Sequence, residues 1–246
     1  MDGDRVVSES CYLLGIDDTD TIDSEYGTGR VSRMLGDHVA DEFADATFRG
    51  SVRQQLLVDP RVPYTTHNSA ACLVFELGEG IDPDDVVDVA AEFLEGIAAD
   101  GSDPGLCAGP VGSVDESVVA FGDRASEELV TEFRATELAA ASGLFLDEYG
   151  GTGEGIIGAL AAVGRTATGD RGRFVGYGRI REYGEPVGVD RLLRDGISVV
   201  TAEGSEVERG QVRSGGWVRP QLRNDRPTLE VERIGEGTFR PTNVTE

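Results

Sequence analysis

Residues 11–30 read CYLLGIDDTDTIDSEYGTGR, and the rest of the chain is interpreted outward from this stretch. The part from Cys11 to Ile16 is apolar apart from one glycine, which is typical of a strand buried on both faces. Gly15 allows another backbone to approach closely at that point. The stretch therefore predicts a central strand that ends in a cluster of acidic residues.

Asp17, Asp18 and Asp20 stand at the carboxyl end of this strand. Carboxylates held close together raise one another's pKa, and a divalent cation offsets their repulsion, so the three predict a magnesium site. Since 46 of the 246 residues are Asp or Glu, ordinary surface acids are an equal alternative on composition alone. The position directly after a buried strand favours the metal site.

A glycine-flanked threonine, Gly27-Thr28-Gly29, follows the acids and presents an accessible hydroxyl on a permissive backbone. The apolar spacing after it predicts a helix from about Val31 to Phe43. A helix start offers free N–H groups and the positive end of a dipole, which favour phosphate oxygens. Gly27, Gly29 and Arg30 are therefore expected to bind the phosphates of a nucleotide, with a solvated surface Arg30 as an equal alternative.

Charge and composition limit the class of protein. The formal net charge is -24, and lysine is absent, so that all 22 basic residues are arginine. An acid excess without lysine indicates adaptation to high salt, which screens self-repulsion within about 3 Å at 1 M. The 39% hydrophobic content fits a soluble globular protein.

Cys11, Cys72 and Cys107 lie far apart in a chain whose histidines are His38 and His67, so neither a zinc site nor a disulfide framework is predicted. The first ten residues do not resemble a signal peptide, and no apolar run approaches the roughly 20 residues that span a bilayer. We expect a cytoplasmic protein with no membrane partner; the oligomeric state stays open.

Two strands, about 51–58 and 70–77, are predicted around a stiff polar turn. Its hydrogen-bonding side chains are slightly favoured as a substrate wall over an ordinary polar loop, and they are Tyr64, Thr65, Thr66, His67 and Asn68. Asp82 and Pro83 then predict the start of an amphipathic helix. This order suits an α+β layer with helices over one face of a sheet.

The Gly/Pro-rich segment 101–115 is interpreted as a connector. A longer helical segment follows, with a predicted buried face made of Ala125, Leu129, Phe133, Leu138 and Ala141. The next glycine-rich turn, 150–155, runs into an apolar helix. It weakly predicts nucleotide contacts from Gly151, Thr152, Gly153 and Gly155, because close helix packing also selects glycine.

From about residue 166 the chain changes to short β-like runs, predicted at Phe174–Tyr177, Ile197–Thr201, Gly216–Arg219 and Thr228–Val231, with a short helix at Val189–Leu193. Basic residues gather here around Trp217: Arg213, Arg219, Arg223, Arg226 and Arg233. They suit a phosphate-bearing ligand. Pairing with the many acids of the chain is the favoured alternative.

GIDDTD at residues 15–20, DPRVPYTTHNSAA at 59–71 and GTGEGIIGALAAVG at 151–164 occur in the same order as in the archaeal 2-agmatinylcytidine synthetases, which this chain resembles over about residues 11–165. Those enzymes modify the anticodon of an isoleucine tRNA: ATP phosphorylates the 2-carbonyl of a cytidine, and agmatine displaces the phosphate. A threonine near the acidic motif becomes phosphorylated. The resemblance implies Thr28 in that role and Asp17, Asp18 and Asp20 as metal ligands.

The resemblance also implies a fold class: α+β, with mixed sheets covered by helices, a kinase-like domain with a ferredoxin-like part. We place a synthetase-like catalytic region at 1–165 and a small β-rich C-terminal region at 166–246. Three departures concern contacts with RNA or phosphate. Thr65 and His67 stand at basic positions of the family, Glu154 stands at an arginine, and the length and cysteines for an OB-fold and zinc ribbon are missing.

Two functions follow. The first is an ATP- and Mg²⁺-dependent ligase-like or kinase-like enzyme that acts on a tRNA cytidine, a smaller nucleoside or an amine. The second is a non-catalytic nucleotide-binding partner of an RNA-modifying assembly. Because phosphate contacts dominate RNA affinity, we expect any tRNA binding to be weak and to run through Arg213, Arg219 and Arg223.

Overall fold

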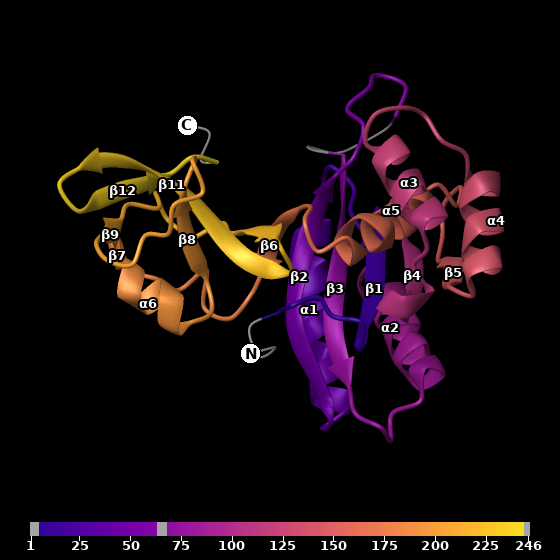
Figure 1. Ribbon diagram of the computed structural model, residues 1–246. Coiled ribbons are helices and arrows are strands. Elements are labelled where there is room, and N and C mark those ends of the chain that lie inside the picture. The colour runs from indigo at the N-terminus through magenta and orange to yellow at the C-terminus, as the bar shows by residue number, and fades with distance from the viewer. Residues whose placement is uncertain (1–4, 63–67, 244–246) are drawn as a thin grey trace.

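The computed structural model describes residues 5–62 and 68–243 (Figure 1). Its main feature is a large mixed sheet in the strand order β5-β4-β1-β3-β2-β6-β10-β11-β12-β9-β7, with β8 pairing β11. The strands are β1 (Cys11–Asp17), β2 (Ala46–Gln55), β3 (Ser69–Leu77), β4 (Gly105–Pro110), β5 (Phe145–Glu148), β6 (Arg173–Gly176), β7 (Val187–Gly188), β8 (Ser198–Thr201), β9 (Gln211–Val212), β10 (Gln221–Arg223), β11 (Arg226–Gly235) and β12 (Thr238–Pro241).

The helices of the described residues are α1 (Thr28–Glu42), α2 (Pro83–Ile97), α3 (Glu116–Ala125), α4 (Glu132–Ser142), α5 (Gly155–Ala167) and α6 (Val189–Arg194), with a 3₁₀ turn at Val111–Ser113. None of them is long and apolar enough to cross a membrane. An α+β class with a mixed sheet is confirmed.

Strand β1 lies inside the sheet, antiparallel to β3 on one side and to β4 on the other. Its side chains alternate between two cores: Leu13 packs with α3, α4 and α5, whereas Leu14 and Ile16 pack with α1 and α2. The predicted buried strand is thus confirmed. Helices cover both faces of this part of the sheet, so the expectation of helices on one face was wrong.

Segment 101–115 is not a plain connector, because Gly105–Pro110 forms β4, which pairs with both β1 and β5. The segment predicted as one long helix is divided into α3 and α4. The turn between them leaves Leu129 47% exposed, and Phe133 on α4 is 72% exposed, so neither belongs to the core. Their spacing is helical, but α3 ends at Ala125 and α4 begins only at Glu132, so Leu129 lies between the two helices.

The remaining predicted elements are present apart from one, and several have different bounds. The strand predicted at about 51–58 is β2, which runs from Ala46 to Gln55. Helix α1 begins at Thr28, three residues before the predicted start, and Gly216–Arg219 forms no strand. The helix start at Asp82 is confirmed, since its side chain accepts a hydrogen bond from the N–H of Asp84 and Pro83 begins the helix. The short helix at Val189 is also present.

The C-terminal part of the chain lies to one side of the first, with β6 between them (Figure 1). Strand β6 pairs with β2 and with β10, so the sheet runs from one part into the other. The proposed division at residue 165 stays a prediction, and residue 165 itself lies inside α5.

Candidate active site

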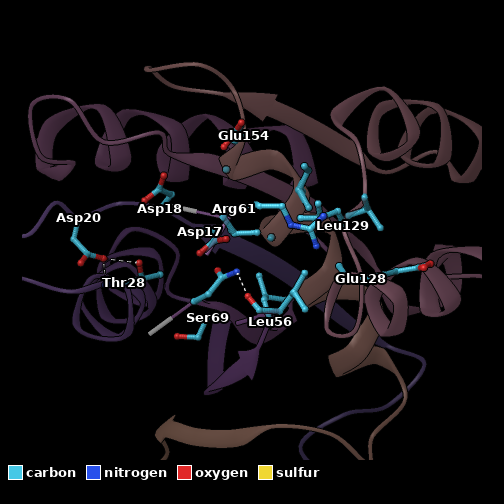
Figure 2. Close-up of a pocket in the computed structure, with 18 residues that line it drawn as sticks. Asp17, Asp18, Asp20, Thr28, Leu56, Arg61, Ser69, Glu128, Leu129 and Glu154 are labelled. Atoms are coloured by element: carbon cyan, nitrogen blue, oxygen red, sulfur yellow. Dashed lines mark hydrogen bonds between the residues drawn. The ribbon is translucent and has the colours of Figure 1, made fainter. Parts of the chain in front are cut away.

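The carboxyl end of β1 opens into a cavity of about 180 Å³ (Figure 2). Five segments wall it: the end of β1 with the loop after it, the start of α1, the described part of the β2–β3 connection with the first residue of β3, the α3–α4 turn with the last residue of α3, and the start of α5 with the residue before it. The lining residues with chemically active side chains are Asp17, Asp18, Asp20, Thr28, Arg61, Asn68, Ser69, Glu128 and Glu154.

Asp17 ends β1 and lies against the first turn of α5. The fit depends on Gly158, because a Cβ there would overlap the Asp17 carboxylate. Burial raises the pKa of Asp17 to about 7, and the charges of Asp18 and Asp20 add to the shift. Such a carboxylate is costly to keep charged and gains from a cation beside it.

Asp18 adopts a left-handed backbone conformation (φ 49°), which is uncommon for a residue with a side chain. Its carbonyl accepts a hydrogen bond from the N–H of Asp103 at 3.1 Å, which ties the acidic loop to the segment before β4. Burial raises the pKa of Asp18 to about 6, and Asp103, Asp20 and Glu154 contribute to the rise. The strained turn thus holds a second carboxylate in a negative environment.

Thr28 is the first residue of α1, and its hydroxyl is part of a short hydrogen-bond chain. It donates to Asp20 Oδ1 at 2.9 Å and accepts from the buried hydroxyl of Thr19 at 3.2 Å. The N–H of Thr28 also donates to Asp20 Oδ1, at 3.0 Å, which caps the helix in place of Gly27. Asp20 therefore both fixes the start of α1 and lies where it can accept the Thr28 hydroxyl proton.

The glycine-rich turn before α5 is anchored by Asp103. Its carboxylate accepts hydrogen bonds from the hydroxyl of Thr152 at 2.6 Å and from the N–H of Gly153 at 2.7 Å. Gly151 and Gly153 both have positive φ, 67° and 89°, which explains glycine at these positions. In this structure the turn positions α5, and its polar groups are bonded to Asp103.

The structure brings together one set of sequence-predicted residues and leaves another outside. Asp17, Asp18, Asp20, Thr28, Asn68 and Gly155 line the cavity. Gly27, Gly29, Arg30, Gly151, Thr152 and Gly153 are not among its lining residues, and Arg30 stacks on Tyr26 instead, 4.2 Å from the ring centre. Tyr64, Thr65, Thr66 and His67 lie outside the described residues.

Arg61 was not among the predicted site residues. It is the one cation among the described lining residues (Figure 2), and it pairs with Asp59 at 2.8 Å. Its signal was available, since it lies within the DPRVP segment that the resemblance includes. Leu129, expected in the core, lines the cavity from the α3–α4 turn.

The predicted magnesium site has suitable donors, but the ligand set is small. Among the described residues, no three Asp, Glu, His or Cys side chains gather closely enough to hold a metal ion. Mg²⁺ is commonly bound by one or two carboxylates together with substrate phosphates and water. Asp17 and Asp18, with their raised pKa values, therefore fit a cation that arrives with a nucleotide.

No family model matches the chain. TiaS of Haloquadratum walsbyi (strain DSM 16790 / HBSQ001), the 2-agmatinylcytidine synthetase of an isoleucine tRNA, is 32% identical over 164 residues, covering 63% of this chain and 33% of that protein. A solved tRNA fluorescent labeling enzyme matches 63% of this chain and 36% of its own, with a TM-score of 0.52 and 26% identity.

The solved complex of TiaS with its isoleucine tRNA and ATP covers 63% of this chain and 36% of that chain, with a TM-score of 0.53 and 24% identity, a likeness of fold. The chain thus spans about a third of the length of the relatives it matches. Over the part that matches, the chain is a relative of the TiaS 2-agmatinylcytidine synthetases of isoleucine tRNA.

Proposed function

We propose that the chain is an ATP- and Mg²⁺-dependent phosphoryl-transfer enzyme of the TiaS type. The observation that carries the proposal is the hydrogen bond from the Thr28 hydroxyl to Asp20 beside Asp17 and Asp18, in a cavity that the start of α5 also enters. The acceptor that we infer is a cytidine of a tRNA, with a smaller nucleoside or an amine as the alternative. The kinase-like and ferredoxin-like description of the fold belongs to the same proposal.

Asp17 and Asp18 would hold Mg²⁺ together with the phosphates of ATP. When bound, the ion neutralises phosphate charge. Gly155, Ile157 and Gly158 bring the first turn of α5 to the same cavity, where the positive end of the helix dipole favours anions. Arg61 at the cavity wall supplies a cation to the same phosphates.

Thr28 is the proposed phosphate acceptor within the protein. Its Oγ1 forms a bond to the terminal phosphorus of ATP, the bond from that phosphorus to the β–γ bridging oxygen breaks, and ADP leaves. The hydroxyl proton passes to Asp20, whose Oδ1 already accepts that hydrogen bond at 2.9 Å. Placement of the reacting groups supplies much of the rate in such a transfer.

The test uses ATP labelled at the terminal phosphate in high-salt buffer. We expect label on the protein or a product with wild type. Thr28→Val removes the accepting hydroxyl and Asp18→Asn removes a charge that holds the cation, so each should lose at least about 100-fold, the scale of one lost transition-state contact. Asp41→Asn, an exposed acid at the far end of α1, is the matched control and should transfer normally.

Circular dichroism establishes that each variant is folded. Undiminished transfer by the folded Thr28→Val and Asp18→Asn proteins would contradict the assigned roles. Binding of ATP by wild type with no transfer to protein, RNA, nucleosides or amines would instead support the non-catalytic nucleotide-binding partner.

A further inference from the structure

A second cavity, of about 520 Å³, lies where the two parts of the sheet join. We call it the junction cavity; it is lined by Arg53, Gln54, Gln55, Arg165, Asp170, Gly172, Arg173, Gln221, Leu222, Arg223 and Asn243. These residues come from β2, the end of α5, β6 with the loop before it, β10 and the segment after β12. The lining contains four arginines and one aspartate, although the net charge of the chain is -24.

The strand register places two of these arginines directly opposite each other. Arg53 on β2 is the cross-strand partner of Arg173 on β6, and Arg173 is in turn the partner of Gln221 on β10. Directly opposed residues point to the same face of a sheet, and like charges in that relation are destabilising. The pair therefore costs stability unless something negative lies against it.

The other two arginines of the junction cavity have acidic partners. Arg165 pairs with Asp123 at 3.1 Å, and Arg223 with Glu230 at 3.4 Å. Within residues 5–62 and 68–243, no carboxylate lies at ion-pair distance from Arg53 or Arg173. The Nε of Arg173 is moreover buried with no hydrogen-bond acceptor among the described residues.

The positive charge continues beyond the junction cavity. Arg219 is close enough to Arg173 to lower its pKa, after the larger effect of burial. The guanidinium groups of Arg219 and Arg181 lie over the ring of Trp217, at 4.3 and 4.1 Å from its centre, and each donates to a backbone carbonyl. Stacking on the indole restrains both guanidinium groups, and Arg219 adds positive charge near Arg173.

We propose that the junction cavity is an anion site that binds a phosphate group through Arg53 and Arg173. Planar guanidinium groups bind phosphate oxygens in pairs, and bound phosphate removes the repulsion between the two cations. Neighbouring amides orient the cations of the cavity: Gln55 Oε1 accepts a hydrogen bond from Arg53 Nη2 at 3.0 Å, and Gln221 Oε1 accepts one from Arg223 Nε at 2.8 Å. The shared chemistry is that of a phosphate ester or anhydride, from either a small phosphate ligand or the backbone of a nucleic acid.

One contact links this site to the candidate active site. The Nε of Arg53 donates to the hydroxyl of Ser69 at 2.8 Å, and Ser69 lines the cavity that holds Asp17 and Thr28. The Arg53–Ser69 contact therefore lies between the two cavities. The anion site does not depend on the proposed phosphoryl transfer, because it rests on other residues.

Binding is measured in Mg²⁺-free buffer without ATP, by calorimetry with inorganic pyrophosphate and by fluorescence anisotropy with a labelled single-stranded RNA of mixed sequence. Wild type should bind at least one probe, and the double variant Arg53→Gln/Arg173→Gln should bind it about tenfold or more weakly, as expected for lost charged hydrogen bonds. Arg209→Gln, an exposed arginine of the same region, is the control and should bind as wild type does.

Should the double variant fail to fold, Arg53→Lys/Arg173→Lys keeps the charge and loses the paired donors, and weaker binding is again expected. Pyrophosphate binding without RNA binding identifies a small phosphate ligand, whereas RNA binding that pyrophosphate displaces identifies a nucleic-acid backbone. The proposal is overturned if wild type binds neither probe, or if the folded junction variants bind as wild type does. Thr28→Val should retain the binding, which separates this result from the proposed transfer.

Discussion

At the scale of single residues, Asp17 is a carboxylate of the candidate active site whose burial costs stability when it is charged. It is the last residue of β1, its side chain lies against the first turn of α5 with two further acids nearby, and its pKa is raised mainly by burial. A structural aspartate would normally have a partner that lowers its pKa, as Arg61 does for Asp59. At Asp17 a backbone hydrogen bond from Asp18 lowers the pKa, but burial and the neighbouring acids outweigh it. A net upward shift of this kind is typical of a residue kept for binding or chemistry.

We expect Asp17→Asn to stabilise the metal-free protein at about pH 8, by about 1–3 kcal/mol. The folded pKa of Asp17 is about 7 against an ordinary value of 3.8, so the folded state binds the proton more tightly. Its contribution to stability is present below about pH 4 and is lost as the pH rises to about 7. Asparagine carries no charge and removes this loss.

Urea unfolding at about pH 5 and pH 8 with a chelator present measures the effect. The wild type should lose more stability between the two pH values than Asp17→Asn does, and Asp41→Asn should follow the wild type. A variant that is less stable than wild type at pH 8 would show that Asp17 has a structural role instead.

At the scale of elements, the site depends on how closely α5 lies on β1. A Cβ at Gly15 would overlap the carbonyl oxygen of Ala159, and one at Gly105 would overlap the backbone of Gly155. These glycines bring the start of α5 beside the carboxyl end of β1. The close contact between α5 and the sheet therefore requires glycine at these positions, in addition to the packing of the apolar core.

Gly15→Ala should destabilise the protein by about 1–3 kcal/mol, because the methyl group must push α5 away from the sheet. Gly96→Ala on α2 is the matched control: nothing lies within 4 Å of its added Cβ, so alanine should stabilise that helix by about 0.5–1 kcal/mol. Denaturant unfolding of both variants gives the two free energies. Equal effects in the two would contradict the close contact between α5 and β1.

At the scale of the whole molecule, the sheet and the charge act over the entire chain. The sheet continues through β6, so the proposed catalytic part and the β-rich part share backbone hydrogen bonds and the junction cavity between them. The net charge of -24 opposes compaction, because the acids repel one another wherever salt does not screen them.

We expect the melting temperature to rise by several degrees between about 0.2 M and 2 M KCl, since the screening length falls to about 3 Å at 1 M. Thermal melts followed by circular dichroism measure the rise. A neutral osmolyte at matched osmolality should have a smaller effect. A melting temperature that stays constant or falls with KCl would refute the inferred adaptation to salt.

The sequence alone determined the elements whose signals are local. The apolar run before Asp17, the cap at Asp82 and the apolar helix after residue 155 follow from periodicity and end residues, and all three are present. The relation to the synthetases was likewise available from motif order, because the motifs are contiguous residues. Asp17, Asp18, Asp20 and Thr28 were found together for the same reason.

Only the tertiary structure decided which distant segments pair with or contact one another. The strand β4 has small residues with a weak strand signal, and its place inside the sheet comes from pairing with β1 and β5. Leu129 and Phe133 were misplaced because a helical spacing does not show where one helix ends and another begins. Arg53 and Arg173 oppose each other because β6 pairs with β2. Such pairings are set by packing between remote segments, which local sequence does not record.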